Sequence, residues 1–162
     1  MTFEKELLLK EINKLDEKRK LAETVGPEYF EPGMMEYLGE YLGDYDAETG
    51  SFLIRFEAKG TRYNGRTEQI ERIKVGDTLQ LVREPENQFN NNNFVIMTED
   101  SDDVGNMPAE LCNAIAPLFD AGELTIDEAK VSFVDPISKR SRYAKQAVLF
   151  VEARGKVIDK AE

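Results

Sequence analysis

Residues 76–98 read GDTLQLVREPENQFNNNNFVIMT and carry the most informative pattern in the chain. The stretch begins with a glycine–aspartate turn, after which Leu79 and Leu81 alternate with polar residues. This alternation predicts a half-buried strand over residues 78–83, and a second short strand is predicted over residues 94–98. Residues 84–93 are polar and rich in turn formers, so they form a loop. The stretch therefore predicts two strands joined by an asparagine-rich loop.

Strand patterns continue on both sides of this stretch. Upstream, the turn-forming run 46–50 separates residues 37–45 from residues 51–57, where Phe52, Ile54 and Phe56 alternate with Leu53 and Arg55. This pattern is typical of a hairpin with one buried face. Downstream, residues 131–134 and 147–151 read as two further strands, joined by a basic segment. Most of the chain is therefore predicted to be β-sheet.

An N-terminal helix is predicted over residues 3–23. Apolar residues at Leu8, Ile12, Leu15 and Ala22 follow helical spacing, and no Gly or Pro occurs before Gly26. The resulting narrow apolar stripe has two interpretations. It packs on the rest of the domain, or it forms a helical self-association seam, although it spans fewer than three heptads.

A second helix is predicted over residues 108–121. Leu111, Ile115 and Leu118 share one face, Pro108 lies in the first turn and Gly122 follows the last. Pro117 lacks a backbone N–H, so we expect it to kink or end this helix.

The composition excludes several classes of function. The 162 residues contain no histidine and one cysteine, Cys112, which excludes Ser–His and Cys–His catalysis, zinc ligation by His and Cys, and an internal disulfide. Residues 1–20 lack the apolar core of a signal peptide, and no window reaches the roughly 20 apolar residues that span a bilayer. We expect a soluble, cytoplasmic protein without a membrane partner.

The formal net charge of −11 argues against a general nucleic-acid coat. However, residues 1–50 carry −7 of it, residues 51–110 carry −4, and the remainder is neutral. Two aromatic residues each lie within a group of cations. Each group is interpreted either as an ordinary solvated turn or as a local basic surface. The groups are Arg55, Lys59, Arg62 and Arg66 around Tyr63, and Lys139, Arg140, Arg142 and Lys145 around Tyr143.

Motifs for metals and nucleotides are missing from the sequence. The acidic run 99–103 resembles a calcium loop at first, but Val104 and Leu111 occupy the places of two ligands, so a solvated turn is favoured. No glycine-rich phosphate loop of standard spacing occurs. We therefore predict no catalytic residues, no metal site and no cofactor.

Three ordered segments carry a family resemblance. They are Gly60-Thr61-Arg62-Tyr63, then the run of residues 76–94 with its Arg83-Glu84-Pro85 and asparagines, and last Val104-Gly105 with Met107-Pro108 and the helix that follows. In order and spacing they resemble the HIRAN domain family, which is found fused to chromatin-remodelling-type helicases and as small stand-alone microbial proteins. The match spans roughly residues 51–155.

The resemblance implies a mainly β fold, α+β overall. It is a small OB-like or SH3-like β-barrel of about six strands with one packed helix, to which this chain adds an N-terminal helix. We accordingly divide the chain into residues 1–36, the helix and connector, and residues 37–158, a HIRAN-like domain with its core motifs in 51–155.

The resemblance also implies a binding site for the 3′ end of single-stranded DNA. In that reading Arg62 contacts phosphate, Tyr63 and Phe89 stack on terminal bases, and Asn87 and Asn90 meet the terminal nucleotide and its 3′-hydroxyl. Such roles are physically reasonable, because stacked bases contribute about 1–3 kcal/mol each without sequence preference. Further implied nucleic-acid-binding positions are Asn92, Asn106 and Tyr143.

The chain departs from the family pattern at several positions. Asn90 stands where the family has aspartate, and an amide both accepts and donates, which weakens discrimination against a 3′-phosphate. Phe89 replaces a tyrosine and keeps the stacking face without the hydroxyl. Asn64 and Asn93 stand where members have tyrosine and alanine.

The leading hypothesis is a non-enzymatic module that binds single-stranded DNA through a polar, aromatic pocket, in DNA repair or replication. The alternative is a protein-interaction module on the same barrel, in which DNA binding is lost and the N-terminal helix recruits a partner or forms a homodimer. A metal-dependent nuclease using an acidic cluster is a third hypothesis.

Overall fold

The computed structural model of the chain describes residues 2–25, 37–139 and 146–158. Its α-helices are α1 (Phe3–Val25), α2 (Arg66–Ile70) and α3 (Ala109–Asp120), and short 3-10 helices lie at Leu38–Glu40 and Ile137–Lys139. None of the described helices is long and apolar enough to cross a bilayer. The predicted boundary between residues 36 and 37 adjoins residues 26–36, which are outside the described residues.

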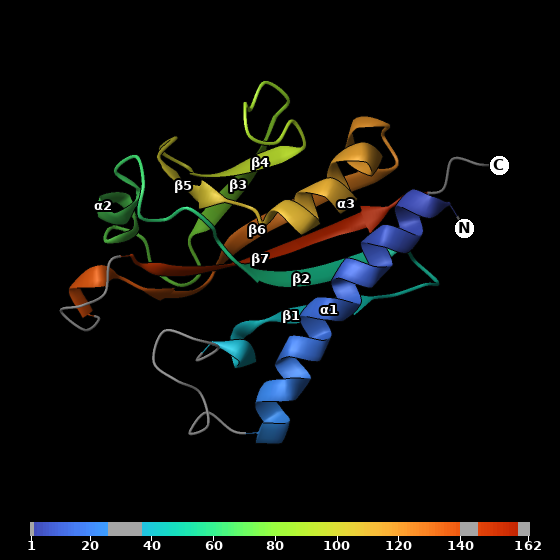
Figure 1. Ribbon diagram of the computed structural model, residues 1–162, viewed down its shortest axis with the longest axis horizontal. Coiled ribbons are helices and arrows are strands. Elements are labelled where there is room, and N and C mark those ends of the chain that lie inside the picture. The colour runs from blue at the N-terminus through green and yellow to red at the C-terminus, as the bar shows by residue number, and fades with distance from the viewer. Residues whose placement is uncertain (1, 26–36, 140–145, 159–162) are drawn as a thin grey trace.

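Seven strands form one antiparallel sheet in the order β1-β2-β7-β6-β3-β4-β5 (Figure 1). They are β1 (Leu42–Tyr45), β2 (Ser51–Glu57), β3 (Thr78–Glu84), β4 (Asn93–Thr98), β5 (Asp103–Asn106), β6 (Leu124–Asp135) and β7 (Val148–Val157). The sheet is not closed, since β1 and β5 are its two edges. An isolated antiparallel bridge from Lys59 to Asn106 nevertheless connects β5 with the segment directly after β2.

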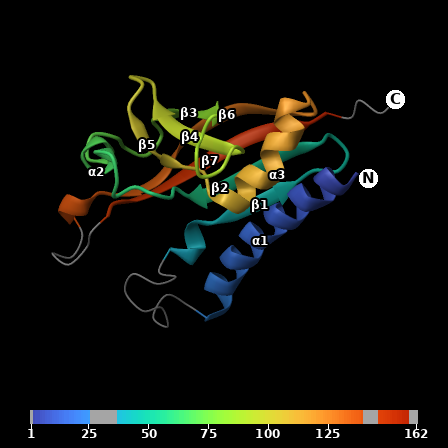
Figure 2. The same cartoon turned by 45° about the horizontal axis from the view of Figure 1, so that its top comes forward.

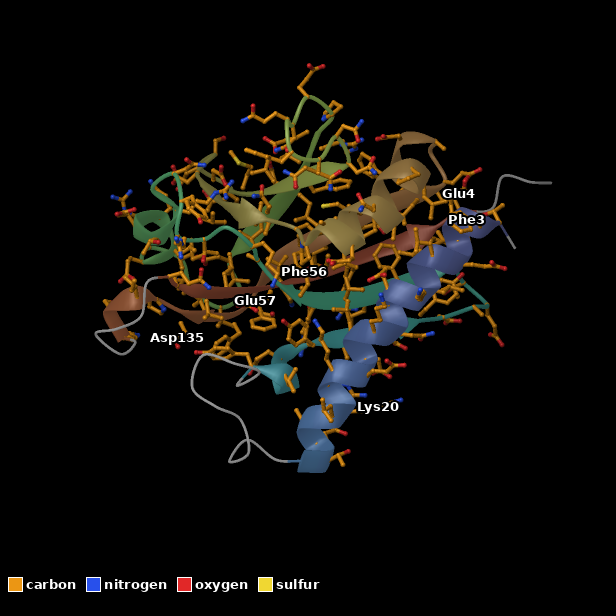
Figure 3. All side chains as sticks on the ribbon, viewed as in Figure 1. Phe3, Glu4, Lys20, Phe56, Glu57 and Asp135 are labelled. Carbon is orange, nitrogen blue, oxygen red and sulfur yellow. The ribbon has the colours of Figure 1, made fainter. Side chains whose placement is uncertain are left out.

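The predicted fold class is therefore confirmed as mainly β and α+β, with a packed helix and an N-terminal helix. The expected barrel of about six strands is corrected to an open sheet of seven. The hairpin is confirmed as β1 and β2, but its first strand is shorter than the predicted 37–45, because residues 38–40 form a 3-10 helix and the strand begins at Leu42. The turn closes through the Gly50 N–H, which donates to the Asp46 carbonyl at 2.7 Å. The β2 alternation is also confirmed, because Phe56 is fully buried and its neighbour Glu57 is only half-buried (both labelled in Figure 3).

The central strands β6 and β7 are longer than predicted. The expected strand 131–134 is only part of β6, and the expected strand 147–151 covers only the beginning of β7, which starts at Val148 and continues to Val157. The β6–β7 register shifts between Ile126 and Glu128 and again between Val131 and Phe133. These irregularities interrupt the period-two pattern, and polar residues at the start of β6 obscure it further. The short elements β5 and α2 were not predicted.

The second predicted helix is confirmed as α3, with one correction. Pro117 lies inside the helix, which continues to Asp120, so the proline does not end it at once. A proline this close to the C-terminus of a helix costs little helix stability, because only the hydrogen bond of its own missing N–H is lost and the helix ends one turn later. Leu111, Ile115 and Leu118 are buried as expected.

The apolar stripe of α1 packs into the core of the chain itself. Leu8, Ile12 and Leu15 are at most 6% exposed and belong to the main core. The helix lies against β1 and α3 (Figure 2). It approaches β1 so closely that a β-carbon at Gly43 would overlap the carbonyl oxygen of Ile12. Of the two interpretations of the stripe, packing on the domain is the one observed.

Candidate nucleic-acid interface

The predicted binding residues lie on three neighbouring segments. Arg62 and Tyr63 are in the loop of residues 58–65, between β2 and α2. The β3–β4 loop, residues 85–92, carries Asn87, Phe89, Asn90 and Asn92, and we call it the asparagine loop. Asn106 ends β5. Tyr143 lies outside the described residues. Figure 1 shows both loops on the side of the molecule away from α1.

The loop of residues 58–65 turns through left-handed backbone conformations. Gly60, Asn64 and Gly65 have φ angles of 70°, 58° and 75°, a region that glycine and asparagine tolerate best. The turn leaves Arg62 exposed and the Tyr63 side chain 55% exposed. The Arg62 guanidinium carbon lies 5.0 Å from the centre of the Tyr63 ring. This loop thus presents an aromatic ring with a cation beside it.

The asparagine loop is shaped by its own side chains. Asn87 Oδ1 accepts the backbone N–H groups of Phe89 and Asn90 at 2.9 and 3.0 Å, and Asn90 Oδ1 accepts that of Asn92 at 3.0 Å. Asparagine favours such local turns because its short amide reaches the backbone two or three residues ahead. The turn places the Phe89 side chain outside the core, 89% exposed.

Asn113, on α3, is a neighbour that sequence reasoning missed. Its Oδ1 accepts the side-chain amides of both Asn90 and Asn92, each at 3.2 Å. The asparagine loop is thereby attached to the exposed face of α3. The sequence offers no signal for this contact, since Asn113 is a single polar residue on the outer face of an amphipathic helix.

Arg83 holds the base of the asparagine loop. Its Nη1 donates to the carbonyl oxygens of Asn91 and Asn93, at 2.7 and 3.3 Å. Its Nε and Nη2 donate to the two carboxylate oxygens of Asp120 at the end of α3, at 3.1 and 2.8 Å. A planar guanidinium is suited to such forked bonding. Arg83 therefore joins β3, the loop and α3.

Arg66 is a buried structural cation and contributes nothing to an exposed basic group. Its side chain is 7% exposed and donates to both carboxylate oxygens of Asp103 at 2.9 and 3.0 Å. It also donates to the Gly60 carbonyl at 3.1 Å and to Asn106 Oδ1 at 3.4 Å. Arg55, another member of that predicted group, pairs with Glu152. Of the four cations in that group, Lys59 and Arg62 are exposed, and Arg62 lies over the Tyr63 ring.

Arg62 is an exposed cation on the first loop, and Cys112 is a buried thiol beneath the second. Arg62 has no acidic partner among the described residues. Burial raises the pKa of the Cys112 thiol to about 11, so this side chain stays neutral under the base of the loop. Within the described parts of the chain, no group of three or more Cys, Asp or Glu side chains is arranged to hold a metal ion.

A cleft of about 340 Å³ lies elsewhere, between α1, β2 and the start of α3. Lys18 Nζ lies 4.4 Å from the centre of the Tyr41 ring there, and the Tyr41 hydroxyl donates to Glu57 at 3.3 Å. Burial, reinforced by Glu57, raises the pKa of that hydroxyl. None of the predicted binding residues lines this cleft.

A family model described as the HIRAN domain matches residues 51–152. Among solved structures, a protein from Lactobacillus plantarum is 19% identical, with 65% of this chain and 98% of that chain covered at a TM-score of 0.49. The HIRAN domain of human HLTF is 23% identical, with coverages of 66% and 81% and a TM-score of 0.46. A search of curated proteins finds no match.

Proposed function

The chain belongs to the HIRAN domain family, and from that premise we propose that it binds single-stranded DNA at a 3′ end, as a binding module without catalysis of its own. Family membership supports nucleic-acid binding in general. The finer proposal is that two exposed aromatic rings and the polar groups around them hold the terminal nucleotides. Its residues are Arg62, Tyr63, Asn87, Phe89, Asn90, Asn92, Asn106 and Tyr143.

One observation carries the proposal: two aromatic rings stand in solvent on loops rich in hydrogen-bonding groups. Phe89 is 89% exposed and Tyr63 is 55% exposed, although a phenylalanine side chain normally gains free energy by burial. Bases stack on such rings without regard to sequence. A ligand with flat, apolar faces, such as the bases of a nucleic acid, therefore explains why these two rings are exposed in the free protein.

The charge of the chain limits how such a ligand binds. The net charge of −11 repels a polyanion at a distance, so attraction has to come from local groups, namely the exposed Arg62 and Lys59 and the amide donors of the asparagine loop. Binding of phosphates by an arginine releases counterions, and the affinity therefore falls as salt concentration rises. We expect modest affinity and a clear salt dependence.

Fluorescence anisotropy with short labelled oligonucleotides tests the proposal. We expect single strands with a free 3′-hydroxyl to bind more tightly than the same strands blocked by a 3′-phosphate, and both to bind more tightly than blunt duplex. Arg62→Ala should weaken binding several-fold. Arg154→Ala is the matched control, since Arg154 is an exposed arginine on the outer face of β7.

Two results would contradict the proposal. One is negligible binding of every oligonucleotide by the wild-type chain, unchanged by Arg62→Ala. The other is an equal loss of affinity in Arg62→Ala and Arg154→Ala, which would indicate unspecific charge attraction. Incubating the labelled strands with Mg²⁺ and checking their length on a gel tests the nuclease alternative in the same samples.

A protein partner or homodimer on α1 is the weaker candidate. The apolar stripe that would form a seam is buried in the chain's own core, and the exposed apolar side chains of α1, Phe3 and Leu21, lie at its two ends. Light scattering of wild type and Leu21→Glu tests it: a mass that falls from dimer to monomer would favour self-association through this face.

A further inference from the structure

A chain of side-chain hydrogen bonds begins beneath the loop of residues 58–65. The Arg66 guanidinium donates through Nη1 to the Gly60 carbonyl and through Nη2 to Asn106 Oδ1. Gly60 precedes Arg62 by only two residues. A β-carbon at Gly60 would lie 2.8 Å from Arg66 Nη1, so the glycine leaves room for this close approach. Arg66 thus connects the backbone of one loop with the end of β5.

Asn93 continues the chain towards the second loop. Its Nδ2 donates to Asn106 Oδ1 at 3.1 Å and to Glu84 Oε1 at 2.6 Å. Asn93 is 7% exposed and Arg66 is 6% exposed. Buried polar groups of this kind are costly to leave unpaired, so a fully bonded arrangement is held in one geometry.

The chain ends on the backbone of the asparagine loop. Glu84 Oε1 also accepts the Asn87 amide at 3.2 Å. Asn87 Oδ1 in turn accepts the backbone N–H groups of Phe89 and Asn90. We call the set Arg66, Asn106, Asn93, Glu84 and Asn87 the amide relay. It connects the Gly60 carbonyl with the Phe89 N–H without a break.

We propose that the amide relay fixes the position of the Arg62–Tyr63 loop relative to the asparagine loop, and that Arg66, Asn93 and Glu84 are positioning residues for nucleic-acid binding. The inference rests on the proposed function. Two rings bind neighbouring bases with full effect only when their separation is set in advance, since ordering them during binding costs free energy. Arg66, Asn93 and Glu84 are buried or half-buried, so they act through the loops.

Paired substitutions at Glu84 separate positioning from charge. Glu84→Gln keeps an acceptor oxygen for Asn93 and Asn87, whereas Glu84→Ala removes it. Both variants remove one negative charge, which by itself strengthens binding of a polyanion. We expect Glu84→Gln to bind single-stranded DNA at least as tightly as wild type and Glu84→Ala to bind about fivefold to tenfold more weakly. Equal or tighter binding by both variants would overturn the proposal.

Amide hydrogen exchange on the free protein tests the same inference without a ligand. Asn93→Ala breaks the middle of the relay, so exchange should accelerate at both ends, in residues 60–63 and in residues 89–90. The control Arg55→Gln breaks the Arg55–Glu152 ion pair on the outer sheet face and should leave both loops unchanged. Acceleration confined to residues 89–90, or to neither loop, would refute the coupling.

The two measurements distinguish the two proposals. If the wild-type chain binds no oligonucleotide and Asn93→Ala still accelerates exchange in both loops, the proposed ligand is wrong while the coupling stands. If the wild type binds but Asn93→Ala retains both affinity and protection, the binding proposal survives and the relay proposal fails.

Discussion

The loop of residues 58–65 and the asparagine loop each expose one aromatic ring, but the chain holds them differently. The first depends on left-handed backbone at Gly60, Asn64 and Gly65 and on two buried side chains, those of Arg66 and Thr61. The Thr61 hydroxyl donates to the Ala147 carbonyl at 2.8 Å. The second is held by many smaller contacts, from its own amides and from Arg83 and Asn113. Substitution of one buried side chain should therefore disrupt the first loop. The second loop should become only slightly more flexible with each contact that is removed.

The largest expected effect is that of Arg66→Ala. It removes the ion pair with Asp103 and one of the two donors to the Gly60 carbonyl, which keeps the Tyr63 N–H. The loss should lower the free energy of unfolding by about 3 kcal/mol, chiefly because Asp103 is left without its buried partner. Urea unfolding followed by circular dichroism measures the loss. Arg66→Lys should lose less, because an ammonium still donates to one partner but cannot reproduce the fork. A loss below about 1 kcal/mol for Arg66→Ala would contradict the stated dependence of this loop.

The second largest effect is expected from alkaline pH, which should lower the free energy of unfolding through Cys112. Cys112 Sγ lies 3.3 Å from the Met107 carbonyl and 3.9 Å from Asn93 Oδ1, under the base of the loop. Because burial raises the thiol pKa from 9.0 to about 11 in the folded state, its contribution to stability is complete below pH 9 and is lost as pH rises through 11.

Urea unfolding of wild type and Cys112→Ala across that range isolates this contribution. The stability of the wild type should fall more steeply with pH than that of the variant, since lysines and tyrosines titrate equally in both. Parallel pH profiles for the two proteins would show that the thiol is not protected by burial.

The rings themselves should matter for binding and little for stability. Phe89→Ala should weaken binding of single-stranded DNA about tenfold, within the range of about 1–3 kcal/mol for one stacked base, and leave urea unfolding unchanged because the ring is 89% exposed. Tyr63→Ala should have a similar effect, and Tyr63→Phe, which keeps the ring, very little. Unchanged affinity in both alanine variants would remove stacking from the proposed site.

The smallest expected effect is that of Asn113→Ala. It removes the shared acceptor of the Asn90 and Asn92 amides, two exposed bonds whose loss should cost less than about 1 kcal/mol. Hydrogen exchange should accelerate in residues 90–92 and stay constant in residues 60–65. Asn113→Asp keeps an acceptor oxygen and should preserve the wild-type exchange. Faster exchange in residues 60–65 would mean that the loops are also coupled through α3.

The sequence predicts best where one apolar pattern repeats within one element. Helix α1 and helix α3 follow from apolar residues at helical spacing, and the β1–β2 hairpin from alternation around a turn. Strand β5 and the first half of β6 were not predicted, because they are short or polar and gain their stability from neighbouring strands. The bulges in β6 conceal its length further.

In the candidate site, local motifs are likewise predictable from the sequence, and contacts between distant residues are not. The asparagine loop and the glycine turn before Arg62 are local motifs, which the sequence shows directly. Asn113 and the pairing of Arg66 with Asp103 join residues far apart in the chain, and no single-sequence pattern encodes which distant partner a polar side chain meets. For the same reason Arg66 was assigned to an exposed basic group, although burial and its partners make it structural.

The sequence alone predicts the family, the mainly β fold, the two long helices and the two loops that carry the candidate residues, because these depend on local periodicity and on ordered motifs. The tertiary structure was needed to show that the apolar face of α1 packs on the chain's own core, that the sheet stays open, and that Arg66, Asn93 and Glu84 connect the two loops. The physical reason is that hydrogen bonds between distant residues form only after the sheet has brought its strands together.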